Sequence, residues 1–292
     1  MGTFSRSLAL TKQSWSVLKE NPQLALFPLI SGVVTLIVLA SFAVPGFFLI
    51  SNMHVDQSGN PTGQMQPAYY AFMFAFYLVS YFVVIFFNSG LVTCANEIFA
   101  GRPCTFKDGM RNAFSHIGSI FCYAFIAATV GMILKTVAER AGFVGSIIAR
   151  VLGFGWTLLT YFVAPILVIE NKGPVQAIKD SGSMLRKTWG ENIIVNTSLH
   201  LIFSLIAMVA IIPIGIGVYL LATGAMIIGA MTIVGGIFFI LLVSLISSTL
   251  TGVFQTALYL YAKTGYLPAV YDPSVVQYAF KPKKGESNYP RY

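Results

Sequence analysis

Few residues in this 292-residue chain have the type and spacing to do chemistry, and His200 is the first of them. His200 lies inside a long uncharged run, whereas His54 and His116 lie in polar segments. Asn196, His200 and Ser204 are four residues apart, so on a helix they share one face. An ionisable side chain inside a membrane span is a functional candidate. The alternative is an interhelical hydrogen bond, typically worth about 0.6 kcal/mol.

A second polar stripe occurs further along the same run. Its members are Ser244, Ser248, Thr251 and Gln255, and Tyr259 extends it. If both stripes face one interior, they would line a polar crevice suited to a carrier of small solutes or lipids. Small and hydroxylated residues also let helices pack closely, and Gly235, Gly236 and Gly252 favour this packing interpretation.

The sequence contains no P-loop, no GxSxG and no HExxH motif, which predicts a non-enzymatic protein without cofactor or metal. Cys94, Cys104 and Cys122 lack the spacing of a metal site. Their odd number gives no disulfide framework, so we expect reduced thiols. Glu97 and Glu170 are expected to pair with nearby basic residues such as Arg102 or Lys172 rather than to act as an acid–base pair.

The composition places the chain in a membrane. It is 56% hydrophobic and only 10% charged, whereas a soluble domain carries about 25% charged residues. The net charge of +8 is read as the excess of Lys and Arg in cytoplasmic loops, and no nucleic-acid partner is expected.

The apolar runs predict an all-α, polytopic membrane protein with six transmembrane helices. A run of about 20 apolar residues is enough to cross a bilayer. The fourth span carries Pro165 inside its helix, and a turn near Thr223 and Gly224 separates the last two. The expected spans are residues 23–50, 68–96, 117–134 and 151–169, with two more in 192–262. This gives an N-terminal amphipathic segment (1–22), a six-span domain (23–265) and a C-terminal tail (266–292).

Three short basic segments precede the odd-numbered spans, at residues 3–20, 105–116 and 170–191. We expect each to form an amphipathic elbow helix at the cytoplasmic membrane surface, in three helical-hairpin repeats. Basic and Trp residues also gather at such interfaces without any repeat. The residues expected to meet lipid headgroups are Lys12, Trp15, Lys179, Arg186, Lys187 and Trp189.

Several stretches together resemble a bacterial membrane family known as domain of unknown function 6159. They are FFNSGLVTCANEIFAGRPCTFKDGMRNAF, the third span with Gly131, GWTLLTYFVAPILVIENKGPVQAIKDSGSMLRKTWGEN and the early SWxxLxxNPxLxxFP pattern. The resemblance covers roughly residues 4–200 and weakens in the last two spans. It implies a six-span inner-membrane protein and no established activity. More loosely, the elbow-plus-hairpin pattern is similar to membrane domains attached to some glycerophosphodiester phosphodiesterases.

Two functions follow as expectations. The first is a protein with both termini in the cytoplasm that acts through contacts with membrane lipids, a membrane-protein partner or its own copies. The second is a transporter that uses the two polar stripes. An intramembrane enzyme is a third and weaker alternative, because no nucleophile and base are visible.

Overall fold

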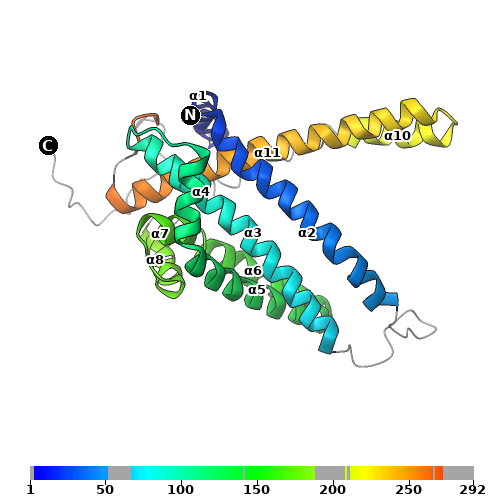
Figure 1. The fold of residues 1–292 in the computed structure, drawn as a ribbon, viewed down its shortest axis with the longest axis horizontal. Helices are drawn as coiled ribbons and strands as arrows, with labels where there is room; N and C mark the ends of the chain where they lie inside the picture. The colour runs from blue at the N-terminus through cyan, green and yellow to red at the C-terminus, as the bar shows by residue number, and fades with distance from the viewer. Residues whose placement is uncertain are drawn as a thin grey trace. The chain divides into compact units, whose positions relative to one another are not determined.

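The computed structural model describes residues 3–51, 67–140, 142–187, 208, 211–265 and 267–271. Every regular element in these ranges is a helix (Figure 1). The elements are α1 (Thr3–Glu20), the 3₁₀ helix η1 (Pro22–Ala25), α2 (Leu26–Ser51), α3 (Pro67–Phe99), α4 (Phe106–Ser115), α5 (Ile117–Arg140), α6 (Gly142–Leu159), α7 (Val163–Ile169), α8 (Pro174–Lys187), α10 (Ile211–Ala222) and α11 (Met226–Thr264).

Five helical stretches in the described residues are long and apolar enough to cross a membrane. They are Pro22–Leu49, Ala68–Phe99, Ile117–Glu139, Gly145–Ile169 and Met226–Thr264. The all-helical, many-span prediction is therefore confirmed. The expected fifth span begins at residue 192, and only its last part is described, as the shorter apolar helix α10. The predicted turn is present at Thr223 and Gly224, where Gly224 adopts a positive φ of 91°.

The expectation that the fourth span is one continuous helix around Pro165 is wrong. Residues 160–162 form a turn that separates α6 from α7, and Pro165 lies in the first turn of α7. Proline has no N–H, and its ring clashes with the carbonyl four residues earlier, here that of Tyr161. Proline inside a helix therefore kinks or breaks it, and here the break at residues 160–162 leaves Pro165 in the first turn of α7, where proline is tolerated.

The chain divides into two compact units. Unit 1 comprises Met1–Ala25, Phe99–Gly101 and Met184–Tyr292, and unit 2 comprises Leu26–Ile98 and Arg102–Ser183. In unit 2 the core forms around the C-terminal half of α3, where α4 and α5 pack on it. Its buried cluster consists of Val83, Phe86, Phe87, Ala113 and Ile120.

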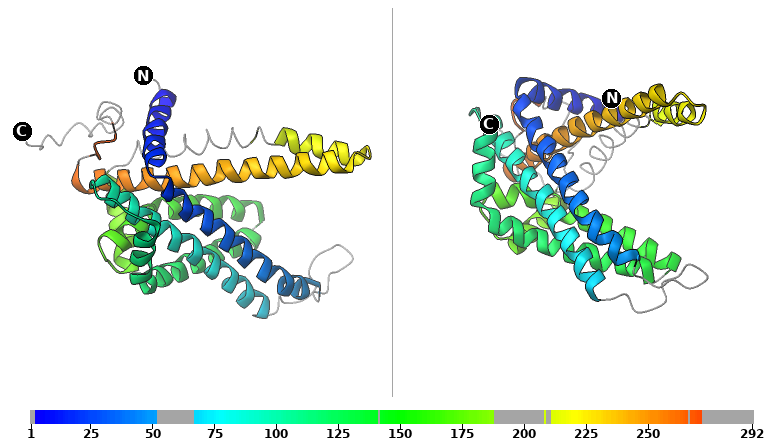
Figure 2. Two further views of the ribbon diagram at one scale, coloured as in Figure 1. Left: turned by 45° about the horizontal axis from the view of Figure 1, so that its top comes forward. Right: turned by 45° about the vertical axis from the view of Figure 1, so that its right-hand side comes forward.

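The helices of unit 1 are buried only over part of their length. With 39 residues, α11 is about 58 Å long, whereas the hydrocarbon core of a bilayer is about 30 Å thick. Its N-terminal half pairs with α10 as a hairpin, as Figures 1 and 2 show. There the apolar side chains point outward, and Ile227 is 74% exposed. The C-terminal half is buried almost throughout from Thr249 to Tyr259 and packs against α1 and η1.

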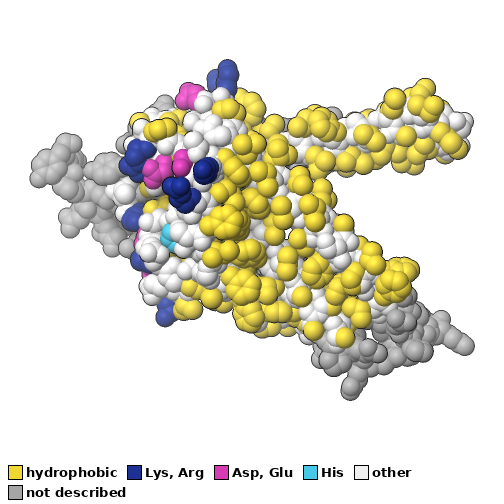
Figure 3. Space-filling model, in the orientation of Figure 1, with side chains coloured by type: hydrophobic (Ala, Val, Ile, Leu, Met, Phe, Trp, Pro, Cys, Tyr) yellow, Lys and Arg dark blue, Asp and Glu magenta, His cyan; other side chains and the backbone are white. Residues whose placement is uncertain are grey.

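Unit 2 shows the same separation of apolar and charged surface. Figure 3 shows α2 and α3 covered with hydrophobic side chains, while the charged side chains gather near α4. Exposed apolar residues along most of a helix are stable only when lipid takes the place of water. Within each unit, therefore, the buried residues gather toward the charged ends of the helices, and the rest of the helix surface is apolar and exposed, as in helices long and apolar enough to cross a membrane.

Helices α3 and α4 approach each other closely in the core of unit 2. A methyl group added at Gly109 would lie 2.7 Å from the carbonyl oxygen of Gly90 and 2.5 Å from the ring of Phe27. Backbone cannot move aside as a flexible side chain can. This contact therefore requires glycine and fixes how α4 sits on α3.

We expect Gly109→Ala to destabilise the protein by about 1–3 kcal/mol, because overpacking a tight contact forces the backbone to shift. The measurement is equilibrium unfolding in detergent micelles. Gly118→Ala is the matched control, since nothing lies within 4 Å of the added methyl group and alanine favours the helix. Equal stability of the two variants would contradict the assignment of Gly109 to a tight contact.

Candidate functional site

The three predicted elbow segments are helices α1, α4 and α8, and side-chain bonds define where α4 begins. The backbone N–H of Thr105 donates to Oδ2 of Asp108 at 3.0 Å, and the Asp108 N–H donates to Oγ1 of Thr105 at 3.3 Å. This reciprocal pair is a capping box that starts α4. Hydrogen bonds from Thr105 hold the pKa of Asp108 below its usual value.

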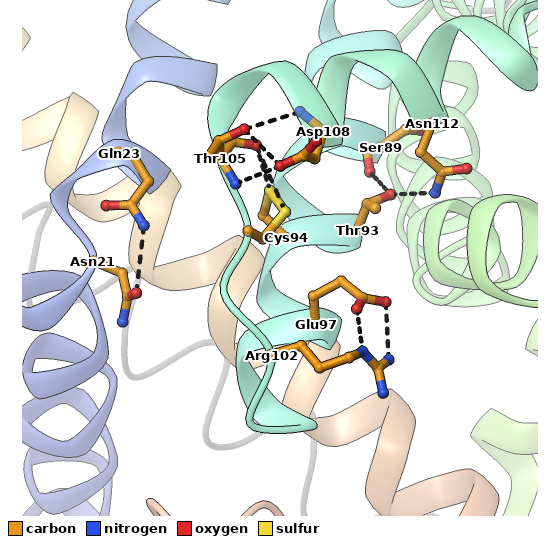
Figure 4. The surroundings of a disulfide bond; sticks show 11 residues. Asn21, Gln23, Ser89, Thr93, Cys94, Glu97, Arg102, Thr105, Asp108 and Asn112 are labelled. Carbon is orange, nitrogen blue, oxygen red and sulfur yellow. Dashed lines mark hydrogen bonds and ion pairs between the residues drawn. A yellow bond between two sulfur atoms is a disulfide. The ribbon is translucent and has the colours of Figure 1, made fainter.

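The connection from α3 to α4 is held by an ion pair. Glu97 accepts two hydrogen bonds from the guanidinium of Arg102, one of them at 3.0 Å from the terminal nitrogen (Figure 4). The backbone N–H of Arg102 also donates to the backbone carbonyl of Glu97 at 2.9 Å, and Gly101 adopts a positive φ of 74°. The predicted pairing of Glu97 with Arg102 is thus confirmed.

The expectation that all three cysteines are free thiols is wrong for two of them. Cys94 and Cys104 form a disulfide, with their Cα atoms 5.2 Å apart, whereas Cys122 is free and exposed. That Cα separation is within the usual range for a disulfide. The chain reverses at Gly101 after α3 ends and brings Cys104 back beside Cys94. An odd total of cysteines does not reveal such a local pairing, because the third lies on another helix.

A second set of ion pairs joins the end of α7 to α8. Lys172 Nζ lies 2.7 Å from Oε2 of Glu170 and 2.8 Å from Oδ2 of Asp180. The Gln176 amide also donates to Asp180, at 2.7 Å. The predicted Glu170–Lys172 pair is confirmed, and Asp180 is an additional partner that the sequence did not predict. Lys172 holds the pKa of Asp180 below its usual value.

The buried faces of α4 and α8 supply hydrogen bonds to neighbouring helices. The backbone N–H of Phe162, freed by the break between α6 and α7, donates to Ser181 Oγ at 3.0 Å, and both residues are fully buried. Asn112 on α4 donates to Thr93 Oγ1 at 2.8 Å and to the Val168 carbonyl at 3.4 Å. The elbows of unit 2 are therefore integral parts of the core and do not merely lie on its surface.

A three-residue pattern recurs in the elbows, with an exposed lysine, a polar residue and a small buried residue. The triplets are Lys12-Gln13-Ser14, Lys107-Asp108-Gly109 and Lys179-Asp180-Ser181. Four residues after each small residue the chain is buried again, at Leu18, Ala113 and Leu185. The three helices therefore bury corresponding faces.

The opposite face of each elbow carries a stripe that we call the elbow stripe. An α-helix turns by about 100° per residue. The members of the stripe therefore lie about 100–200° around the helix axis from the small buried residue. Large apolar side chains are exposed there, with Trp15 at 45% and Phe114 and Val175 at 57%. The members are Lys12, Trp15 and Lys19 on α1, Lys107, Arg111 and Phe114 on α4, and Val175, Lys179 and Arg186 on α8.

The sequence identified only part of these stripes. It pointed to Lys12, Trp15, Lys179 and Arg186, all of which are exposed. Lys19, Lys107, Arg111 and Phe114 lie in the basic segments that the sequence marked as elbows, but only the position of the recurring triplet places them, with Val175, in the stripe. Lys187 ends α8, and its side chain is not described. Trp189 lies outside the described residues.

The two predicted intramembrane stripes have different outcomes. Asn196, His200 and Ser204 lie outside the described residues. On α11, Ser248 is exposed, and Thr251 and Gln255 are half-buried. The hydroxyl-bearing residues of α11 that are fully buried are Thr249, Thr256 and Tyr259. Thr249 and Thr256 donate to carbonyls of their own helix at 2.8 and 2.9 Å, and the Tyr259 hydroxyl accepts from Lys263 Nζ at 3.2 Å. A common crevice of both stripes stays a prediction.

Unit 1 has a contact between its N- and C-terminal segments that the sequence did not predict. Tyr271 is buried, and its hydroxyl lies 2.8 Å from Ser14 Oγ of α1. The ring of Phe99 lies 6.0 Å from that of Tyr271. Burial raises the pKa of Tyr271 well above its usual value. The segment 267–271 thus packs back onto the same face of α1 that corresponds to the buried faces of α4 and α8.

We expect Ser181→Ala to destabilise the protein by about 1–3 kcal/mol, because the buried N–H of Phe162 loses its hydrogen-bond partner. Ser183→Ala is the control two residues away, since Ser183 is exposed and its hydroxyl bonds only within α8; its effect should stay within about 0.5 kcal/mol. Both are measured by equilibrium unfolding in micelles. A Ser181→Ala protein as stable as Ser183→Ala would show that the hydrogen bond is unimportant.

Comparison with known sequences identifies a family. The profile of DUF6159, a family of unknown function, matches residues 67–268. The match begins later than the expected resemblance, which started at residue 4. It also continues through α11, where the resemblance was expected to weaken. Among curated proteins the comparison found no match. Because the profile matches well over half of the chain, the protein belongs to the DUF6159 family.

Proposed function

We propose that this protein is a non-enzymatic membrane protein that acts through contacts of its elbow stripes with anionic lipid headgroups. The observation that carries the proposal is the exposed Trp15, Phe114 and Val175 beside basic side chains, on helices whose opposite faces are buried in protein. A basic face next to an exposed apolar side chain is typical of helices that lie in a membrane interface.

The energetics favour lipid as the partner of these stripes. Each Lys or Arg close to an anionic membrane surface contributes about 1 kcal/mol of attraction, and Trp is enriched at the headgroup level. Every elbow carries two such basic residues in its stripe. Since the stripes lie at the ends of apolar helices, they are placed where headgroups begin. A membrane-protein partner or a second copy of the chain could use the same faces.

The proposed arrangement is that of a six-span protein of a bacterial inner membrane, with the elbows and both termini in the cytoplasm. Its support is the position of the 18 Lys and Arg residues, most of which lie in the elbows and the C-terminal segment, as positively charged loops on the cytoplasmic side do. A reporter active only in the cytoplasm, fused after Tyr292, should be active. An active periplasmic reporter at the same position would overturn this orientation.

We also propose that the elbows and hairpins form three related units. The recurring triplet supports this, and so do the ends of α3, α7 and α11. Each of these helices is followed by a residue with positive φ and then, two or three residues later, by a proline. The pairs are Gly101 with Pro103, Asn171 with Pro174, and Gly265 with Pro268. A left-handed residue followed by proline ends a helix sharply.

The alternative function is transport of a small solute or lipid. The observation that favours it is the break between α6 and α7, because discontinuous membrane helices with freed backbone groups are typical of transporters. Here the freed N–H of Phe162 is bound by Ser181. The polar crevice would be lined by Asn196, His200 and Ser204 together with Ser248, Thr251 and Gln255.

Native mass spectrometry of the full chain, released from vesicles with equal phosphatidylglycerol and phosphatidylcholine, tests the two functions. We expect phosphatidylglycerol to be retained preferentially. Lys12→Ala with Lys19→Ala, or Lys107→Ala with Arg111→Ala, should lower that preference. Two lost contacts of about 1 kcal/mol each correspond to about 30-fold at a single site.

The matched control is Lys12→Arg with Lys19→Arg, which keeps both charges and should keep the preference. Retention that is the same in the alanine and arginine pairs would count against the lipid proposal. A small polar solute bound at fixed stoichiometry, in place of lipid, would favour the transporter.

A further inference from the structure

Cys94 and Cys104 lie where the chain passes from α3 to the elbow α4. We propose that they are a reversible dithiol–disulfide pair, oxidised by a peroxide, whose state sets how firmly α4 is held to the end of α3. The proposal rests on the cytoplasmic orientation given above, because it concerns a compartment in which thiols are normally kept reduced.

The two sulfur atoms are held together by more than their own bond. Cys94 is on α3 and Cys104 precedes the N-cap of α4, and both are buried. Between them the chain is fixed by the Glu97–Arg102 ion pair and by the Arg102 N–H bond to the Glu97 carbonyl. Directly after Cys104, the capping box holds Thr105 to Asp108. None of these bonds involves a sulfur atom, so we expect them to keep the two thiols adjacent when the disulfide opens, ready to close again.

The same redundancy argues against a purely structural staple. A disulfide contributes most where nothing else closes the loop. Here the enclosed loop is short, with a sequence separation of 10, and the contact of Gly90 with Gly109 already seats α4 on α3. Disulfides on a cytoplasmic face are usually transient and redox-sensing. The pair is therefore suited to modulating a connection that is already formed.

The chemistry balances with a peroxide as oxidant. Because Cys104 is buried, peroxide reaches it when the start of α4 opens. The Cys104 thiolate then attacks one peroxide oxygen, the O–O bond breaks, and Cys104 becomes a sulfenic acid as water leaves. The Cys94 thiol then attacks the Cys104 sulfur, the S–S bond forms and a second water leaves. Two thiols and one hydrogen peroxide thus give one disulfide and two waters. A cellular dithiol returns the pair to the reduced form by thiol–disulfide exchange.

The consequence concerns the elbow stripe of α4. This stripe begins at Lys107, three residues after Cys104, and continues with Arg111 and Phe114. The Gly90–Gly109 contact sets how α4 sits on α3, and an oxidised pair adds a covalent hold that makes opening of the start of α4 rarer. A reduced pair allows the start of α4 to open more often. In this way the redox state of the pair would regulate the proposed lipid contact.

The test uses the full chain with Cys122→Ser, which leaves the pair as the only thiols, in phosphatidylglycerol nanodiscs. After reduction and removal of the reductant, half of the sample is treated with hydrogen peroxide. Maleimide labelling under denaturing conditions should add two labels to the reduced sample and none to the oxidised one. Amide hydrogen exchange in α4 should be faster in the reduced sample, by up to about 100-fold for a loop of this length. Treating the oxidised sample with a dithiol should restore its two maleimide labels and its faster α4 exchange.

Cys104→Ser in the same background is the control, and its α4 exchange should be fast with or without peroxide. Thiols that peroxide does not couple would overturn the proposal. Equal α4 exchange in the reduced and oxidised samples would also overturn it. A third contradicting result would come from cells whose thiols are blocked at harvest, if the protein carries only the disulfide both before and after the cells are shifted to reducing conditions. Labelling and exchange do not depend on lipid preference, so failure of the lipid proposal in native mass spectrometry is a separate result.

Discussion

The structure depends on one constraint, which is that every buried backbone N–H needs an acceptor. The hydrogen bond from the Phe162 N–H to Ser181 meets this constraint where the fourth span is broken. A backbone polar group that lacks a helical partner cannot be left bare in an apolar surrounding, because no water is there to bind it. Pro165 breaks the fourth span and frees this N–H, and α8 supplies the missing acceptor from its buried face. The elbow α8 thus supplies the hydrogen-bond partner that the break in the fourth span requires.

The same requirement explains why the core lies at the ends of the spans. Along α11 the N-terminal half faces outward with apolar side chains, and burial begins near Thr249. In unit 2 the buried cluster also lies in the second half of α3. Lipid and apolar side chains are chemically alike, so burying one against the other gains little. Close packing instead develops where polar groups, glycine contacts and chain reversals need partners.

The elbows join this core to the surface that we assign to function. Each elbow has a small residue on its buried face and basic and large apolar residues on its exposed face. The buried face is fixed by specific contacts, such as Gly109 against Gly90 and Ser14 against Tyr271. The exposed stripes are consequently presented by helices whose opposite faces are anchored in protein. For α4, the Cys94–Cys104 pair adds a covalent tie that chemistry can open.

The sequence by itself determined the helical membrane class, the positions of most spans, the elbows and the Glu97–Arg102 and Glu170–Lys172 pairs. These follow from local composition and from charges within a few residues of each other, which act before any tertiary contact forms. Tertiary structure alone decided the disulfide, the Ser181 hydrogen bond and the docking of Tyr271 on Ser14. Each of these joins residues on different segments, separated by 10 to 257 positions. Their proximity depends on where the chain reverses and on how helices pack, and a linear pattern does not contain that information.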